Sequence, residues 1–476
     1  MGNQKELVQT GNPTYQKPAG LLKSFSRGDI WTKLSALIMG TGCFARKQIV
    51  RGCIFLLFEG LFIWYMIYHG SYWISMLPSL GKQGPTIETV TKLGRTTETR
   101  IPHDNSFKIL LYGILTAFLI IAFIITWASN IKAAYDAQER AAAGKKVNTF
   151  RDDLRSLVDE KFYKTLLTLP TIGITIFTFM PIVFMILVAF TNFDGEHDGY
   201  KMNLFHWVGL ENFRTMFSTA HGATSTSYFG TFMQVLGWTI IWAIIATFSN
   251  YILGILVAMM INKKGIRFKK MWRTIFVMTI AIPQFISLLY VAKLFDQDGL
   301  INLMLKNWGL ISKQIDFWGT PLYARILVLV LNLWVGIPYL MLIATGILMN
   351  IPQDLYEAAR IDGASPFQQF RYITMPYMLF VTAPYLLTSF TGNMNNFNVI
   401  FLLSGGGPIN SKAPTAAGGI GKTDLLITWL FKITTGTDSQ YYFASVISIV
   451  IFVLVATLTL LVYNRLGSNK NEGDMA

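Results

Sequence analysis

Ser389, Asn393 and Asn396 are the residues whose type and spacing most clearly allow chemistry, and they stand in an otherwise apolar part of the chain. Ser389 and Asn393 lie four residues apart and Asn393 and Asn396 three apart, so on a helix they would form one polar stripe. Such amides and hydroxyls can pair with the OH groups of a carbohydrate, or with partners across two membrane helices. The pattern leaves both roles open.

Asn332, Gly336 and Tyr339 predict a second stripe of the same kind. They recur at helical spacing, and Pro338 is expected to open the helix locally. An aromatic ring and an uncovered backbone suit the apolar faces of a sugar. Polar residues in lipid-buried helices mostly face the protein interior, where we expect both stripes to lie.

Catalytic and metal-binding patterns are missing from the sequence. Gly421-Lys422-Thr423 ends like a phosphate-binding loop, but Ala416 replaces its first glycine and no strand is predicted before it. The histidines show neither metal-ligand spacing nor a Ser-His-Asp arrangement. They are His69, His103, His197, His206 and His221. We therefore expect no catalytic residue, no metal site and no cofactor bound by this chain.

Composition indicates a membrane protein. Of 476 residues, 52% are hydrophobic and only 14% are charged, whereas soluble domains carry about a quarter charged residues. The net charge of +14 fits lysines and arginines retained beside a membrane, so no nucleic-acid partner is expected. Only Cys43 and Cys53 are present, which excludes a disulfide framework.

Eight apolar runs are long enough to cross a bilayer, which takes roughly 20 residues. Because they are continuous rather than alternating, they predict helices and not a barrel. The fold class is therefore all-α and polytopic. The expected spans are 51–68, 108–128, 165–190, 232–261, 274–295, 325–348, 377–402 and 440–463.

Basic residues predict the orientation. They concentrate in the N-terminal arm, in residues 132–164 and in the hinge between Lys263 and Arg273, which places both termini in the cytoplasm. The polar start of the chain has no signal-peptide core, so the first apolar run is expected to direct insertion. The predicted parts are a cytoplasmic arm, two N-terminal spans with a cytoplasmic segment, a permease core and a cytoplasmic tail. They cover residues 1–50, 51–164, 165–465 and 466–476.

An amphipathic helix is predicted between the second and third spans. Its apolar residues recur at helical spacing with charges between them. They are Phe150, Leu154, Leu157, Val158 and Phe162. This helix would lie on the inner membrane face or pack against another cytoplasmic protein, and the sequence favours neither.

Residues 351–378 predict a helix, a tight turn and a second helix at the cytoplasmic surface. Pro352 suits a first helical turn, and Gly363 would end that helix in a left-handed conformation. Ser365 and Gln368 have the spacing of a capping box for the next helix. The small residues Ala358 and Ala359, with Gly363, allow another protein to approach closely.

This segment resembles the EAA loop of binding-protein-dependent ABC importers. The matching residues are Glu357-Ala358-Ala359, Gly363 six positions after the glutamate, and Ile373 followed by Pro376. In that family the loop is the helix seated on the ATPase subunit. The resemblance implies an ATPase-coupling site at Glu357, Ala358, Ala359, Asp362 and Gly363.

Three further stretches resemble the larger, MalF-type permease subunit of maltose and maltodextrin importers. They begin at Asn332 (NLWVGIPY), Ser389 (SFTGNMNNFNVIFLLSGGGP) and Gly421 (GKTDLLITWLFKIT). This resemblance implies a type I importer permease fold and a sugar site. The implied substrate-binding residues are Gln284, Asn332, Gly336, Tyr339, Ser389, Asn393 and Asn396. Ile280 and Gly392 replace aromatic residues of maltose permeases, which points to another oligosaccharide, maltodextrin-like or galacto-oligosaccharide.

The resemblance also implies the assembly. The chain would lie in a bacterial cell membrane beside lipid. It would pair with a second homologous permease, two ATPase subunits that hold ATP and Mg, and an extracellular sugar-binding protein. Two alternatives are a stand-alone secondary sugar carrier and a membrane enzyme acting on lipid-linked sugar. A proton-coupled carrier would show a chain of intramembrane carboxylates, whereas Glu59 stands alone in the first span.

Overall fold

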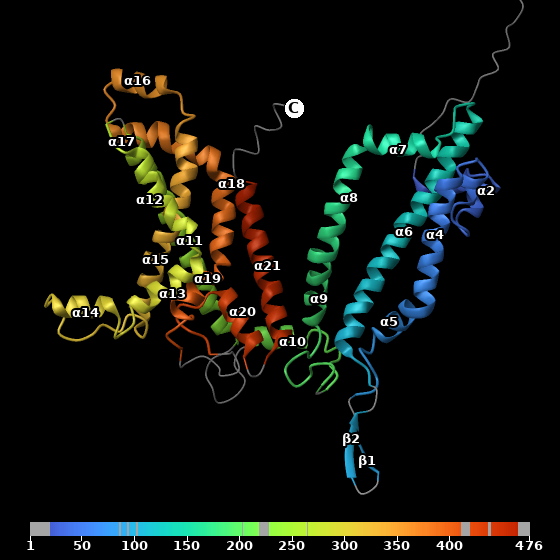
Figure 1. Cartoon of the computed structure of the whole chain (residues 1–476), viewed down its shortest axis with the longest axis horizontal. Helices are drawn as coiled ribbons and strands as arrows, with labels where there is room; N and C mark the ends of the chain where they lie inside the picture. Colours follow the sequence, from blue (N-terminus) through green and yellow to red (C-terminus); the bar gives the residue numbers. More distant parts are fainter. Residues whose placement is uncertain are drawn as a thin grey trace, which may run out of the picture. The chain divides into compact units, whose positions relative to one another are not determined.

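The computed structural model confirms a polytopic helical membrane protein. Among the residues that the structure describes, seven helices are long and apolar enough to cross a membrane, and a bent helix pair raises the number of crossings to as many as eight. The chain forms two compact units, Met1–Val208 (unit 1) and Gly209–Ala476 (unit 2) (Figure 1). The structure describes residues 20–84, 87–92, 95–100, 103–201, 203–218, 228–263, 265–410, 419–436 and 439–464.

Unit 1 contains three long apolar helices. The first continues from α4 through a π-helical turn into α5, so it ends at Met76, beyond the predicted limit at residue 68. The third is likewise interrupted by a π-turn between α8 and α9. Their bounds are α4 Ile49–Tyr65, η1 Met66–Gly70, α5 Ser71–Met76, α6 Ser106–Ala142, α8 Phe162–Ile174, η2 Thr175–Phe179 and α9 Met180–Val188.

The described part of the N-terminal arm packs on α6. It consists of the short helices α1 (Leu21–Ser26), α2 (Ile30–Leu34) and α3 (Thr41–Phe44). The buried Asn130 amide of α6 donates to the Ser35 carbonyl at 2.8 Å and accepts from the Gly40 amide at 3.0 Å. Glu59, the lone carboxylate of the first span, accepts a 2.8 Å hydrogen bond from the Met39 amide. Glu59 therefore holds the arm against the span.

Two connections in unit 1 differ from the sequence prediction. A β-hairpin joins α5 to α6, with β1 (Ile87–Lys92) antiparallel to β2 (Arg95–Arg100), and the sequence analysis had predicted no strand there. The predicted amphipathic helix over 150–162 is also shorter. It ends as α7 (Phe150–Val158) because Asp159 leaves the helical conformation, and Phe162 already begins α8.

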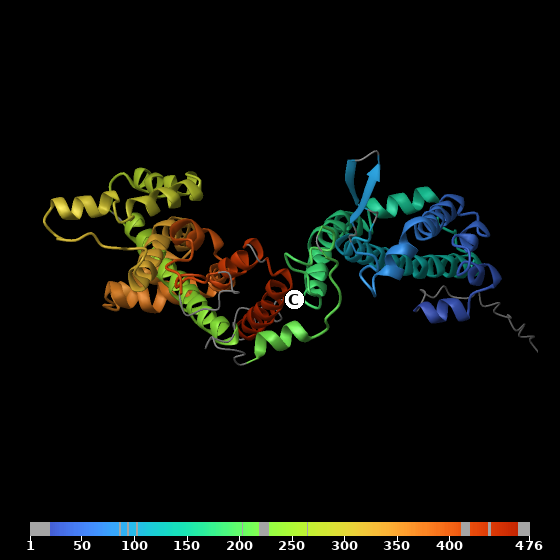
Figure 2. The same cartoon turned by 90° about the horizontal axis from the view of Figure 1, so that it is seen from below.

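Unit 2 is built around α11 (Tyr228–Asn262), which packs against α15 (Pro321–Leu348) and α18 (Met375–Met394). Gly254 allows α11 and α15 to approach closely, because a Cβ there would lie 2.6 Å from the Leu340 Cβ. Of the remaining helices of unit 2, α14 projects to one side and α16 lies at one end (Figures 1 and 2). The remaining helices are α10 Glu211–Phe217, α12 Lys269–Ala281, α13 Gln284–Leu294, α14 Leu300–Asn307, α16 Gln353–Ile361, α17 Pro366–Gln369, η3 Phe370–Thr374, α19 Phe397–Ser404, α20 Leu426–Thr435 and α21 Tyr441–Tyr463.

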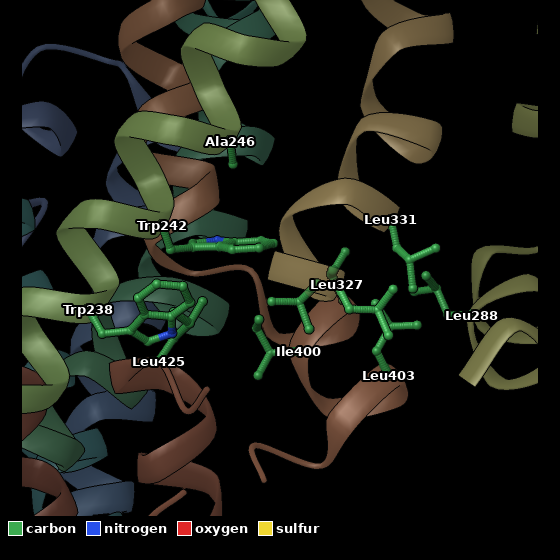
Figure 3. Packing of buried hydrophobic residues seen from close by; sticks show 11 residues of the cluster. Trp238, Trp242, Ala246, Leu288, Leu327, Leu331, Ile400, Leu403 and Leu425 are labelled. Carbon is green, nitrogen blue, oxygen red and sulfur yellow. The ribbon is translucent and has the colours of Figure 1, made fainter. Parts of the chain in front are cut away.

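A buried hydrophobic cluster fixes α11, α13, α15 and α19 against one another (Figure 3). Trp242 of α11 is fully buried within it, and Leu288, Val328 and Ile400 come from the other three helices. Interdigitated apolar side chains of this kind position the helices that carry the candidate site.

One prediction about a proline was wrong, and one predicted span is bent at another proline. The expected fifth span, 274–295, is broken into α12 and α13, which meet at 91°. Ile282 is extended there, and Pro283 has no amide to continue the helix. Conversely, Pro338 was expected to open its helix, yet α15 continues through it. Neighbouring helices can hold a proline-containing membrane helix together, and Pro338 is buried.

Candidate functional site

A cavity of about 280 Å³ lies in unit 2 where α12 bends into α13. Gln284 and Ser287 of α13 provide an amide and a hydroxyl, and Trp334 and Tyr339 of α15 provide aromatic surfaces. The rings are 40% and 53% exposed, so they are free to contact a bound molecule. Convergent polar groups beside exposed aromatic rings suit a carbohydrate.

The bend positions Gln284. Because Pro283 ends the preceding segment, Gln284 becomes the first residue of α13 and lies at the cavity instead of inside a continuous span. Ile280, at the end of α12, also lines the cavity, so this departure from maltose permeases stands at the candidate site. Of the sequence-predicted binding residues, the structure brings Gln284 and Tyr339 together here.

Ser389 follows Tyr385 by four residues on α18, so the two side chains share one face of that helix. The Tyr385 ring lies 6.4 Å from that of Tyr339, centroid to centroid. Ser389 itself is not among the residues that line the cavity.

Asn393 and Asn396 have partners within the protein. The Asn393 side-chain amide donates to Thr247 Oγ1 at 2.9 Å, and its backbone carbonyl accepts from Trp242 Nε1 at 3.1 Å. The prediction that Asn396 shares one helix with Ser389 and Asn393 was wrong, because α18 ends at Met394, although Asn396 Nδ2 still lies 3.5 Å from Asn393 Oδ1. Asn396 instead caps α19 by accepting from the Val399 amide at 3.3 Å, since an asparagine side chain can replace a helical backbone partner.

Asn332 and Gly336 face α11. Asn332 is 3% exposed, and a Cβ on Gly336 would lie only 2.2 Å from Asn250 Nδ2. Asn332 Nδ2 and Asn250 Oδ1 are buried and have no hydrogen-bond partner within the described part of the chain. The sequence analysis missed Asn250, Ser287 and Trp334. A polar residue within the apolar run of α11 was the available signal for Asn250.

Residues 351–378, called the coupling segment below after the role that the sequence resemblance implies, have the predicted helix-turn-helix form. Gly363 ends α16 at a φ of 78°, and the Gly363 and Ala364 amides donate to the Arg360 and Ala359 carbonyls. This is a Schellman ending. The capping box between Ser365 and Gln368 is confirmed. Pro352 is the residue before α16 and not its first residue, a small correction.

The surface of this segment is open. Glu357, Ala358, Asp362 and Gly363 are exposed, and Ala359 is half-buried. The large apolar side chains of Ile361 and Phe367 are 86% and 68% exposed. The Tyr356 hydroxyl is 2.9 Å from Thr374 Oγ1, which fixes α16 against η3. A rigid, partly apolar protrusion with acidic residues on one face can dock into a cleft of another protein.

The segment Gly421–Thr423 folds inward and forms no phosphate cradle. The Gly421 amide donates to the buried Asp424 carboxylate at 2.6 Å, and Thr423 Oγ1 donates to the Gly407 carbonyl at 2.6 Å. The Lys422 carbonyl accepts from Arg325 Nε. Asp424 also accepts from Lys432 Nζ at 2.7 Å. These groups fasten a loop to the bundle.

A bundle of membrane-crossing helices with an exposed hairpin of this form defines an ABC transporter permease. Residues 250–469 match the family described as the binding-protein-dependent transport system inner membrane component. With the relatives reported below, this match shows that the chain belongs to that family.

Two of the similar permeases match most of the chain, and a third matches about half of it. The maltodextrin transport system permease protein MdxF of Bacillus subtilis is 33% identical over 447 residues, covering 92% of this chain and 96% of MdxF. The galactooligosaccharides transport system permease protein GanP of the same organism is 33% identical, covering 92% and 98%. The maltose/maltodextrin permease MalF of Escherichia coli K12 is 35% identical, covering 48% and 44%.

A solved structure supports the fold. A bacterial ABC transporter involved in the import of the acidic polysaccharide alginate contains a chain that superposes with a TM-score of 0.51. The match covers 65% of this chain and 96% of the other at 20% identity. At this identity the likeness concerns the fold alone.

Proposed function

We propose that this chain is the permease subunit of an ABC importer that carries a neutral oligosaccharide, maltodextrin-like or galacto-oligosaccharide, across the plasma membrane. Its relatives include permeases named for maltodextrin and for galactooligosaccharides. ATP would be hydrolysed, with Mg, in two separate ATPase subunits. A second homologous permease would complete the pathway, and an extracellular binding protein would deliver the sugar.

One observation carries the proposal: α15 connects the cavity to the coupling segment. Trp334 and Tyr339 line the cavity, and the same helix runs on to Leu348, five residues before α16 begins at Gln353. A displacement of α16 is therefore transmitted along one continuous helix. Such rigid-body coupling lets a distant event open or close a binding site.

The proposed transport cycle follows from the continuity of α15. Closure of the ATPases on ATP would move the Glu357 face of α16, and α15 would rock so that the cavity opens to the outside. Hydrolysis would return it to the inside. The ATPases would thereby shift an equilibrium between two conformations. This cycle requires α16 and both termini to be cytoplasmic, as the basic residues predict.

Sugar recognition would centre on Gln284 and Tyr339, with Ser287 and Trp334 beside them. The amide and hydroxyl would pair with sugar OH groups, and the rings would stack on the apolar sugar faces. Asn332, Gly336, Ser389, Asn393 and Asn396 would shape the surrounding helices or meet the sugar in another conformation.

The test is ATP-dependent uptake of labelled maltodextrins and galacto-oligosaccharides by proteoliposomes of the co-expressed complex. Glu357→Ala should abolish uptake, while Asp354→Ala, on the exposed first turn of the same helix, serves as the matched control. Uptake that continues without ATPase subunits would overturn the importer assignment and favour a secondary carrier.

A further inference from the structure

α7 in unit 1 has an apolar face that the described residues of its own unit leave exposed. Phe150, Leu154, Leu157 and Val158 are 44%, 52%, 41% and 72% exposed. They follow one another at helical spacing, so they form a continuous stripe. A nine-residue helix with this stripe requires an apolar environment on one side.

The acidic residues of α7 are bound within unit 1. Asp153 forms a 2.9 Å ion pair with Arg51 of α4. Asp152 accepts from the Thr149 amide at 2.9 Å in a capping box, and the hydrogen bonds from Thr149, with Lys146 3.2 Å away, lower the pKa of Asp152 to about 2. These contacts fix the rotation of α7 and remove its negative charges from the open side.

The basic residues of α7 remain on the open side. Arg151 and Arg155 are exposed, and neither forms an ion pair with a described residue. Arg151 is three residues from Leu154, and Arg155 is three from Val158, so each guanidinium borders the apolar stripe. The open face therefore combines an apolar stripe with an edge of two exposed guanidinium groups.

The connection to α8 places this face at the membrane boundary. Only Asp159, Glu160 and Lys161 separate α7 from α8, which begins a 27-residue apolar helix long enough to cross a membrane. Thr165 Oγ1 of α8 donates to the Leu157 carbonyl at 2.7 Å, so the junction is fixed. α7 lies across the end of α8 (Figure 1). A helix in this position meets lipid headgroups.

We propose that α7 is an interfacial anchor that binds anionic phospholipid, with its apolar stripe in the acyl boundary and Arg151 and Arg155 on the headgroup phosphates. Guanidinium groups bind phosphate oxygens in a bidentate manner, and basic residues near an anionic leaflet are each attracted to it. The anchor sets the height of α8 in the bilayer. It does not depend on the transported substrate.

The test uses the full-length chain in vesicles, with Cys43→Ser and Cys53→Ser and a nitroxide attached at Leu157→Cys. Collision rates with oxygen and with a water-soluble nickel complex measure the label's depth as phosphatidylglycerol replaces phosphatidylcholine. We expect a lipid-facing label at low phosphatidylglycerol content. Arg151→Gln with Arg155→Gln should raise the phosphatidylglycerol content required for a lipid-facing label by about fivefold per arginine. Lys306→Gln with Lys313→Gln, the same charge change in unit 2, should have no effect.

Other outcomes overturn the proposal. A water-accessible label at every lipid composition would show that α7 does not enter the membrane. A label shielded from both collision partners would place the face against protein, such as another subunit. A lipid-facing label whose depth ignores both phosphatidylglycerol and the arginine substitutions would exclude recognition of anionic headgroups.

Discussion

The Asn393 side chain donates a 2.9 Å hydrogen bond to Thr247 Oγ1 and thereby joins α18 to α11. The same residue accepts from the Trp242 indole through its backbone carbonyl. An asparagine expected to face a sugar is thus engaged in holding two membrane helices together, which was the alternative role left open by the residue pattern.

The Asn393–Thr247 contact predicts a measurable coupling. Asn393→Ala and Thr247→Ala should each destabilise the chain, and their double-mutant cycle should give a coupling of about 0.6 to 2 kcal/mol, the usual range for hydrogen bonds between membrane helices. Equilibrium unfolding in mixed micelles measures it. Zero coupling, together with loss of uptake of one sugar alone, would instead place Asn393 in the binding site.

The cavity at the α12–α13 bend predicts a binding defect. Gln284→Ala should raise the apparent KM for oligosaccharide uptake about tenfold, since one hydrogen bond contributes roughly 1 to 1.5 kcal/mol. Gln314→Ala removes an amide from the α14–α15 connection, far along the chain from the cavity residues, and should leave KM unchanged. An unchanged KM in both variants would move the sugar site elsewhere in the bundle.

Local signals in the sequence were sufficient to predict the structure of the coupling segment. Gly363 and the Ser365–Gln368 pair affect only residues close to them in the chain. Their types and spacing therefore determine the turn and the next helix. The two prolines could not be predicted in this way. α15 has many buried residues that hold it together at Pro338, whereas α12, which leads to Pro283, has none.

The partners of buried polar groups also could not be predicted from the sequence. Asn393 bonds to Thr247, 146 residues away, and Glu59 bonds to a backbone amide of the N-terminal arm. An intramembrane polar residue indicates that some partner exists, but only the packed bundle decides which one.

The burial of Cys43 predicts that its thiol is alkylated slowly. It is fully buried in α3, and burial raises its pKa to about 11, because the charged thiolate is disfavoured away from water. The neutral thiol therefore persists to high pH. In a Cys53→Ser background, iodoacetamide should modify Cys43 roughly 300-fold more slowly at pH 8 than a free thiol, and faster by about tenfold per pH unit.

The control for Cys43 is a thiol on the exposed side of the same arm. Ser26→Cys, with both native cysteines changed to serine, should react at the rate of a free thiol, since Ser26 is exposed on α1. Peptide mass spectrometry follows both sites. Equal rates at the two positions would mean that the arm does not pack on α6 as described.

The Asp424–Lys432 ion pair predicts the largest stability change. Asp424 is fully buried and accepts from the Gly421 amide, from Thr428 and from Lys432, whose side chain is 19% exposed. Asp424→Asn would leave the lysine without its counter-charge in a buried setting, a loss of about 3 to 5 kcal/mol. Thermal unfolding of the purified chain in detergent should show a strongly lowered Tm.

Two further variants separate this charge effect from general damage. Asp296→Asn breaks the exposed Lys293–Asp296 pair and should cost at most about 1 kcal/mol. Asp424→Asn combined with Lys432→Met should recover part of the lost stability, because no unpaired charge remains. If the double variant is no more stable than Asp424→Asn alone, the segment from Gly421 to Asp424 depends on the carboxylate's hydrogen bonds and not on its ion pair.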